Sequence, residues 1–162
     1  SKDNVYITGF TEGGLDGNTN SGKQDIFLVK YNSSGFKLWT KQLGTPLYDS
    51  ANGLAIDSSD NIYVTGYTQG NMYTYSGGKD VFVVKYDSSG TKQLTRQFGA
   101  PSFSQKSQYN SSSQMVSSED EGKKVSIDST GNIYLTGNTQ GGLDGNSNSG
   151  KEDIFLIKYK SM

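Results

Sequence analysis

Two loops of the sequence carry the side chains best suited to binding a metal ion. Both place oxygen-bearing residues at alternate positions ahead of a glycine and a final aspartate. Side-chain and backbone oxygens in this arrangement resemble the ligands of a calcium loop. The candidate ligands are Asp16, Asn18, Asn20 and Asp25 in the first loop and Asp144, Asn146, Asn148 and Asp153 in the second. Calcium binding here would be weak, because two of the early ligands in each loop are neutral amides.

The calcium pattern is also incomplete. The glycine falls one position late, and no glutamate follows that could bind the ion with both oxygens. The corresponding segment in the middle of the chain, residues 71–80, lacks the pattern. The alternative interpretation is a loop of Asx turns, in which Asn and Asp side chains bond to their own backbone. We therefore expect no required cofactor and keep weak calcium binding as a hypothesis.

Carboxylates recur too regularly to indicate an active site. Asp25, Asp80 and Asp153 begin similar apolar segments, whereas Asp57 and Asp128 end others. An active site is made once, so groups repeated in every unit are expected to form hydrogen bonds at turns and strand ends. The chain has no Cys and no His, which excludes thiolate or imidazole zinc sites, cysteine nucleophiles and the Ser-His-Asp triad. The sequence predicts no catalytic residues.

Three lysines also recur, and each precedes a tyrosine: Lys30, Lys85 and Lys158. A basic strip interleaved with Tyr could contact nucleic acid or an anionic glycan. However, 15 basic residues are offset by 16 acidic ones, and the net charge of −1 gives no general attraction for nucleic acid. We interpret these lysines as solvated residues that protect strands from aggregation, and we expect no nucleic-acid partner.

The elements that position these residues are internal repeats. The first signature, typified by Asn-Ile-Tyr-Val-Thr-Gly, occurs at residues 4–9, 61–66 and 132–137. The second, typified by Asp-Ile-Phe-Leu-Val-Lys-Tyr, occurs at residues 25–31, 80–86 and 153–159. A third ends in Gln-Leu-Gly or Gln-Phe-Gly and occurs at 38–44 and 94–99, and a fourth occurs at 53–57 and 124–128. Each is apolar or alternates in polarity, and turns such as Asn-Ser-Ser-Gly separate them. Every signature therefore predicts a β-strand.

The composition agrees with short strands and many turns. Of the 162 residues, 21 are Gly and only 2 are Pro, and the hydrophobic share is 31%. Glycine disfavours helices by roughly 1 kcal/mol relative to alanine. The sequence has no helical periodicity, and no apolar run approaches the roughly 18 residues of a membrane span.

Four short strands in roughly 57 residues are the pattern of a β-propeller blade. In blade order A to D, the chain predicts strands B to D at 4–44, a complete blade at 51–99 and strands A to C at 122–160. Ten strands, or about two and a half blades, cannot close a propeller, which needs about four blades or more. We therefore predict an all-β fold over residues 1–162: a partial β-propeller of four-stranded antiparallel blades, not closed within one chain. Further blades of a parent protein, or self-association into a ring, would complete it.

Residues 100–121 interrupt the repeat with a Ser-rich insertion between two blades. Such polar tracts bury too little apolar surface to become ordered. We therefore expect a flexible surface insertion. The alternative is a partner-binding loop, because binding residues often lie on loops that a rigid scaffold holds.

In combination, the signatures resemble the SBBP repeat, a bacterial family named for seven-bladed β-propellers. The resemblance rests on residues 55–66, 80–90 and 38–44 and covers nearly the whole chain outside the insertion. It implies a secreted or cell-surface bacterial protein and transfers no catalytic residues. We expect a non-enzymatic binding or scaffold module that contacts protein or glycan through its loops. The alternatives are a fragment of a polysaccharide-acting enzyme completed by missing blades, and a purely structural spacer.

Overall fold

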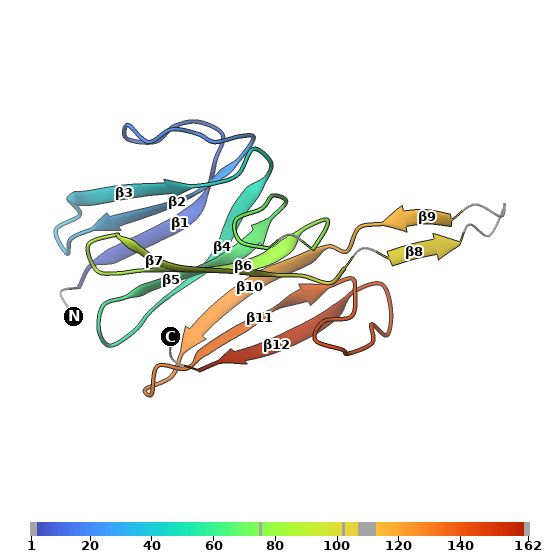
Figure 1. The fold of residues 1–162 in the computed structure, drawn as a ribbon. Coiled ribbons are helices and arrows are strands. Elements are labelled where there is room, and N and C mark those ends of the chain that lie inside the picture. Colours follow the sequence, from blue (N-terminus) through green and yellow to red (C-terminus); the bar gives the residue numbers. More distant parts are fainter. Residues whose placement is uncertain (1–2, 75, 102, 107–112, 161–162) are drawn as a thin grey trace.

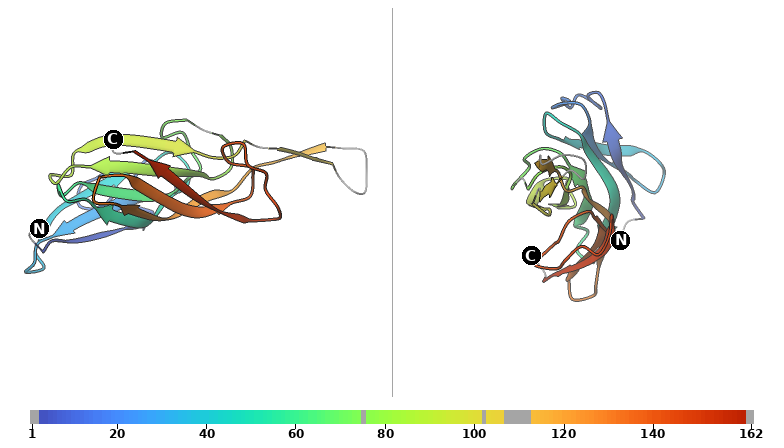
Figure 2. Two further views of the ribbon diagram at one scale, coloured as in Figure 1. Left: turned by 90° about the horizontal axis from the view of Figure 1, so that it is seen from below. Right: turned by 90° about the vertical axis from the view of Figure 1, so that its right-hand side faces the viewer.

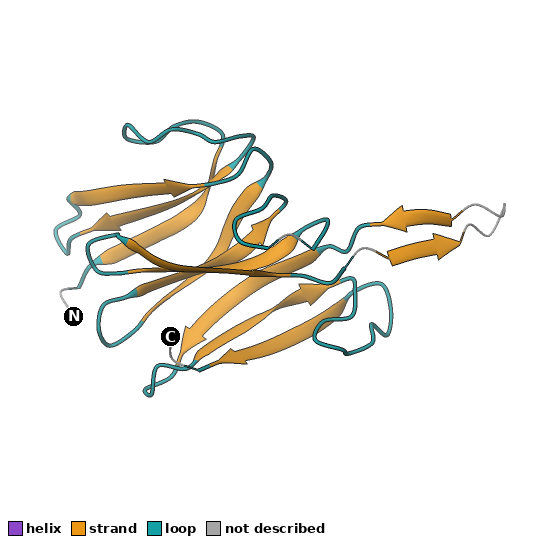
Figure 3. Cartoon of the chain, in the orientation of Figure 1, coloured by secondary structure: helices purple, strands orange, loops and turns teal. Residues whose placement is uncertain are grey.

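The fold is that of a computed structural model, which describes residues 3–74, 76–101, 103–106 and 113–160. In these ranges the chain forms strands and turns and no helix (Figures 1 and 3). Accordingly, the described residues contain no helix that could cross a membrane.

Ten of the strands form three antiparallel sheets, in each of which sequence neighbours pair. The first sheet contains β1 (Val5–Thr11), β2 (Asp25–Tyr31) and β3 (Lys37–Leu43). The second contains β4 (Asp49–Ile56), β5 (Ile62–Thr68), β6 (Asp80–Tyr86) and β7 (Lys92–Phe98). The third contains β10 (Asp120–Ile127), β11 (Ile133–Thr139) and β12 (Asp153–Tyr159). The predicted fold class is confirmed: the chain is all-β, no sheet closes on itself, and sheets of three, four and three strands are consistent with a partial propeller.

The three sheets stack face to face, and the apolar core lies in the two layers between them (Figures 1 and 2). Ile26 and Leu28 of β2 pack in one cluster with Ile62 and Val64 of β5. Val83 and Tyr63 of the second sheet pack in the next cluster, with Ile133 and Leu135 of β11. The second sheet is thus covered on both faces, as expected for strands with nearly continuous apolar sequences.

The first strands of the second and third sheets, β4 and β10, lie side by side. Gly53 permits this close approach, because a Cβ at that position would lie 3.0 Å from the carbonyl oxygen of Lys123. Asn52 is the extra residue where the register of β4 shifts, and its side chain crosses to β10. Its Nδ2 donates to the carbonyl oxygen of Gly122 over 2.9 Å and to Oε1 of Glu121 over 2.8 Å.

Two further strands lie in the segment where we predicted a flexible insertion. β8 (Phe103–Lys106) and β9 (Ser113–Val116) pair antiparallel as a separate two-stranded sheet that projects from the stack (Figures 1 and 2). The periodicity of the repeats gave no sign of these strands. Residues 102 and 107–112 of the predicted insertion lie outside the described residues, so its flexibility stays a prediction.

Candidate functional site

The loops that precede β2, β6 and β12 lie at the same end of the stack as the connection from β3 to β4. Consecutive strands run in opposite directions, so every second connection along the chain returns to the same end of the stack. We call this end the loop end. At the loop end each sheet is tied to the next: Gln24 forms an isolated bridge with Tyr48, and Lys79 forms one with Glu119. The loops are therefore parts of the interfaces between sheets.

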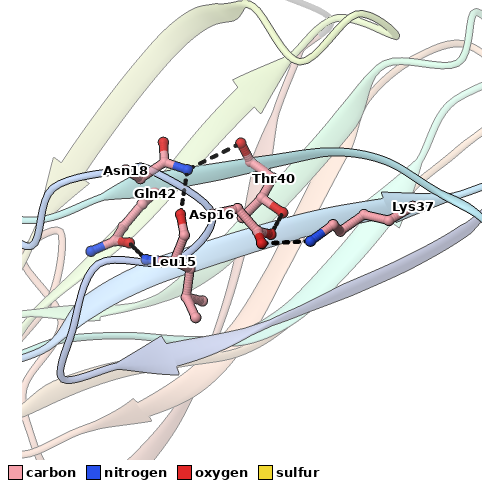
Figure 4. Close-up of polar contacts among 6 residues, drawn as sticks. All are labelled: Leu15, Asp16, Asn18, Lys37, Thr40 and Gln42. Carbon is pink, nitrogen blue, oxygen red and sulfur yellow. Dashed lines mark hydrogen bonds and ion pairs between the residues drawn. The ribbon is translucent and has the colours of Figure 1, made fainter.

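The first predicted calcium loop is braced by its own outer strand, β3 (Figure 4). The carboxylate of Asp16 forms an ion pair of 2.5 Å with Lys37 and accepts a hydrogen bond of 2.5 Å from Oγ1 of Thr40. The hydrogen bond from Lys37, followed by that from Thr40, lowers the pKa of Asp16 below its ordinary value. The Nδ2 of Asn18 donates to the carbonyl oxygen of Leu15 over 2.7 Å. The same Nδ2 lies 3.4 Å from the carbonyl oxygen of Thr40, so both side chains hold the loop against β3.

The other two predicted ligands of this loop have internal partners as well. The Oδ1 of Asn20 accepts from the N–H of Gly22 over 2.8 Å, which is an Asx turn. Asp25 is completely buried, and its Oδ2 accepts from the N–H of Ser21 over 2.8 Å and from Nε2 of Gln42 over 3.0 Å. Each of the four residues therefore takes part in a contact that shapes the loop.

The second predicted calcium loop repeats these turns. Asn146 donates to the carbonyl oxygen of Leu143. Oδ1 of Asn148 accepts from the N–H of Gly150 over 2.9 Å. Oδ2 of Asp153 accepts from the N–H of Ser149 over 2.7 Å. Asp144 is exposed and has a φ of 51° at the tip of the loop. No group of three or more Asp, Glu, His or Cys within the described ranges is placed to hold a metal ion. Calcium binding stays a prediction.

Two glutamines on the outer strands, for which the repeat pattern predicted no role, organise the loops. Oε1 of Gln97 accepts from the N–H groups of Met72 and Tyr73 over 2.8 and 3.0 Å. Its Nε2 donates to the carbonyl oxygen of Gly70 and to Oδ2 of Asp80, both over 2.9 Å. All four hydrogen bonds that an amide side chain readily forms are therefore made, three to the loop and one to Asp80 at the start of β6.

Gln42 does the same in the first sheet. It accepts from the N–H of Leu15 over 3.0 Å and donates to the carbonyl oxygen of Gly13 and to Asp25. The signal in the sequence was the shared ending of the third signature, a basic residue followed by Gln, an apolar residue and Gly, at 41–44 and 96–99.

Four completely buried aspartates lie where one sheet meets the next: Asp25, Asp49, Asp80 and Asp120. Burial raises the pKa of Asp49, and the negative charge of Asp25 raises it further. Burial likewise raises the pKa of Asp80, and the charge of Asp120 adds to that rise. Asp49 accepts from the N–H and Oγ1 of Thr45, at 2.6 and 2.8 Å. These aspartates serve as hydrogen-bonding groups, the role that we predicted for Asp25 and Asp80.

The recurring lysines differ in their environments. Lys30 is buried, which makes the prediction of a solvated side chain wrong for this residue. Its Nζ donates to the carbonyl oxygen of Ser88 in the second sheet over 2.8 Å and lies over the rings of Tyr6 and Trp39. The turn of the neighbouring sheet covers it, and a sequence pattern within one strand could not show this. Lys158 is exposed and lies 5.2 Å from the centre of the Tyr134 ring.

Several aromatic side chains at the loop end are exposed. Tyr73, in the loop between β5 and β6, is 58% exposed, and Tyr48 is 37% exposed on the connection from β3 to β4. Aromatic side chains of this kind supply contact area for a protein or sugar ligand. The loop end therefore combines a braced framework with exposed rings, an arrangement suited to binding.

Comparison with known proteins agrees with this architecture. Residues 38–73 and 116–144 match the family model of SBBP, described as a β-propeller repeat. Both segments are therefore similar to SBBP repeats. The first matching segment extends from β3 through β5, and the second covers β10 and β11. The resemblance noted in the sequence is thereby confirmed.

Two curated relatives extend over nearly the whole chain. An uncharacterized WD repeat-containing protein of Acanthamoeba polyphaga mimivirus is 26% identical over 92% of this chain and 11% of its own length. The regulatory protein FlaEY of Caulobacter vibrioides is 26% identical over 96% of this chain and 17% of its own length. The chain thus spans less than a fifth of either relative. The SBBP matches and the WD-repeat relative indicate that the chain is built from repeats.

Proposed function

We propose that the chain is a non-enzymatic binding module of a larger, secreted or cell-surface bacterial β-propeller protein, and that it contacts protein or glycan through its loop end. The SBBP matches and the repeat-containing relative support a role in binding. The observation that carries the proposal is the pair of exposed rings, Tyr48 and Tyr73, on segments with a fixed backbone. Gln97 accepts from the N–H of Tyr73, and a bridge to Gln24 ties Tyr48 to the first sheet.

The same geometry argues against use of these carboxylates in catalysis. Asp25 and Asp80 are completely buried, and each receives two hydrogen bonds from its own sheet and loop. A general acid or base must reach its substrate within hydrogen-bonding distance. These carboxylates therefore support the scaffold, and the exposed rings are left to contact a ligand.

The test is binding of the biotin-labelled chain to an array of bacterial polysaccharides and an array of extracellular proteins. We expect binding on one array, and we expect a Tyr48→Ala, Tyr73→Ala variant to lose most of it. Phe36→Ala is the matched control, because Phe36 is 70% exposed on the turn between β2 and β3, at the opposite end of the sheet. Binding that survives the double substitution but is lost in Phe36→Ala would contradict the proposal.

The proposed location has its own test. A tagged form of the full-length parent protein should be cut by protease added to intact bacterial cells. Protection of the tag until the cells are lysed would contradict a surface location.

A further inference from the structure

Three basic side chains at the loop end lie over tyrosine rings. The charged group is 4.7 Å from the ring centre in the first two pairs and 5.6 Å from it in the third. A cation in this position is attracted by the electrons of the ring, so each ring helps to hold its charge in place. The pairs are Lys23 with Tyr48, Lys79 with Tyr67 and Arg96 with Tyr73.

One of these cations already has an anionic partner inside the protein. Nζ of Lys79 lies 3.4 Å from Oε2 of Glu119, and the two side chains are 29% and 33% exposed. The same ammonium group lies over the ring of Tyr67. This junction between the second and third sheets therefore shows one lysine that contacts a carboxylate and an aromatic ring at the same time.

The other two cations have no such partner. Among the residues that the structure describes, neither Lys23 nor Arg96 forms an ion pair. The carboxylate of Glu12 accepts instead from Nε2 of Gln24, which follows Lys23 in the chain. Lys23 is exposed, and Arg96 is partly exposed. Both charges are therefore available to an anion from outside the chain.

These two cations lie toward opposite edges of the second sheet. Tyr48 directly precedes β4, whereas Arg96 belongs to β7. The loop between β5 and β6 joins the two places, because Gln69 donates to the carbonyl oxygen of Tyr48 over 2.9 Å and the N–H of Tyr73 bonds to Gln97 of β7. With the strand order β4-β5-β6-β7, three strand spacings of about 4.8 Å separate the edges by roughly 14 Å. A ligand that reaches both cations is therefore an extended chain.

We propose that the ligand of the loop end is an acidic polysaccharide, whose sugars carry carboxylate or phosphate groups. Lys23 and Arg96 bind the anionic groups, and the exposed parts of the Tyr48 and Tyr73 rings contact the sugars. This inference rests on the proposed function and names the ligand class of the same site.

An acidic polypeptide is the alternative ligand. The centre of a protein interface is apolar and depleted in charged residues. At the loop end, both exposed rings of the proposed site carry a cation. This combination fits a ligand in which charged groups and apolar C–H surface alternate over short distances, as they do along an acidic polysaccharide.

The first probe is a fluorescein-labelled oligomer of galacturonic acid, titrated with the whole chain in the presence of a calcium chelator and followed by fluorescence anisotropy. The matched probe is the same oligomer with methyl-esterified carboxyl groups, which keeps the sugars and removes the charge. We expect the esterified oligomer to bind roughly tenfold more weakly, because charge-assisted hydrogen bonds are lost. Binding of the acidic oligomer should also weaken as salt is raised from about 50 to 500 mM, because exposed charges are screened.

Phosphorylated dextran and plain dextran form the second pair of probes, which tests phosphate in place of carboxylate. We expect at least one of the two acidic glycans to bind more tightly than its neutral counterpart. The one that binds identifies which anionic group the site accepts.

Substitutions in the chain test the two cations. Lys23→Gln and Arg96→Gln should each weaken binding of the acidic glycan severalfold, whereas Lys23→Arg, which keeps the charge, should retain most of it. Two exposed lysines are the matched controls, because Lys151 has the position of Lys23 in the loop before β12 and Lys92 starts β7 at the opposite end of the sheet. Lys151→Gln and Lys92→Gln should leave binding unchanged. Thermal melting of every variant checks that it folds.

Three results would overturn the proposal. One is the absence of binding to both acidic glycans at about 1 mM, where only very weak interactions remain undetected. The second is equal binding of each acidic glycan and its neutral counterpart. The third is an equal loss of binding in the cation variants and in their controls. A polyglutamate peptide that binds as tightly as the galacturonate oligomer would assign the site to acidic polypeptides and would also contradict it.

Failure of this inference can be told apart from failure of the proposed function. A ligand found on the arrays that the tyrosine double variant loses, but that Lys23→Gln and Arg96→Gln both retain, would leave the proposed function standing. That result would exclude only the acidic polysaccharide.

Discussion

The Nε2 of Gln97 donates to Oδ2 of Asp80 over 2.9 Å, and this bond joins the outer strand β7 to the first residue of β6. Gln42 and Asp25 form the same bond over 3.0 Å between β3 and β2. In both sheets the glutamine also fixes backbone groups of the adjacent loop. The outer strand thus sets the conformation of the loop as well as the edge of the sheet.

The loss of this glutamine should therefore destabilise the second sheet. We expect Gln97→Ala to lower the free energy of unfolding by about 1–3 kcal/mol, because buried N–H and carboxylate groups lose their partner. Urea denaturation followed by circular dichroism measures the change. Gln93→Ala is the control, because Gln93 is an exposed residue of the same strand and should cost less than about 0.5 kcal/mol. Equal losses in the two variants would show that the loop does not depend on Gln97.

Identical side chains at corresponding positions of the repeats should differ in their contribution to stability. Leu28 of β2 is 1% exposed, whereas Leu156 of β12 is 68% exposed. We expect Leu28→Ala to cost about 2–5 kcal/mol, as for other buried leucines. Leu156→Ala should change the stability by less than about 0.5 kcal/mol. Thermal and urea unfolding of both variants test this, and a large loss from Leu156→Ala would mean that this face is covered in solution.

The buried Asp80 should make stability fall as the pH rises. Burial raises the pKa of Asp80 in the folded state above the ordinary value of 3.8, so the folded protein binds the proton more tightly than the unfolded chain does. The contribution of this carboxyl to stability is therefore greatest at low pH and is lost as the pH rises above 3.8. We expect the stability of Asp80→Asn, relative to the unmodified chain, to increase between about pH 4 and pH 7, as measured by urea midpoints.

The pKa of Asp128 is shifted in the opposite direction to that of Asp80, so its effect on stability should have the opposite dependence on pH. Hydrogen bonds from Asn132 and Thr130 hold its pKa well below the ordinary value, so its contribution is present at neutral pH and is lost as the pH falls below 3.8. Asp128→Asn should therefore be most destabilising near neutral pH. The same pH trend in both variants would refute the assignment of opposite shifts.

Calcium should leave the stability of the chain unchanged. Asp16 already holds Lys37 and Thr40, and a metal ion would have to displace both. We expect no shift of the melting temperature when about 1 mM calcium replaces a chelator, because a ligand that binds only the folded state must raise it. A rise that Asp16→Asn abolishes would instead establish the weak calcium site that the sequence suggested.

The strands of the three stacked sheets could be predicted because each signature carries its own strand pattern and turn, whereas β8 and β9 belong to no signature. The Asp57 turn is an example: its carboxylate accepts from the N–H groups of Ser59 and Asn61, contacts that lie within the signature itself. The loop bracing could not be predicted in the same way, because Gln97 and Asp80 meet only once β7 has paired with β6. The burial of Lys30 could not be predicted for a related reason, since its partner, Ser88, lies in the turn between β6 and β7 of another sheet.

The second sheet is covered by a neighbour on each face, whereas the first and third sheets are each covered on one. In stacked repeats, stability is a sum of each unit and its nearest-neighbour interfaces. Backbone amides of β5 and β6 should therefore exchange with deuterium last, and those of β1 and β12 first. The chain would then open from both sides inward, and the order of exchange would depend on the position of each sheet in the stack and not on differences among its repeats.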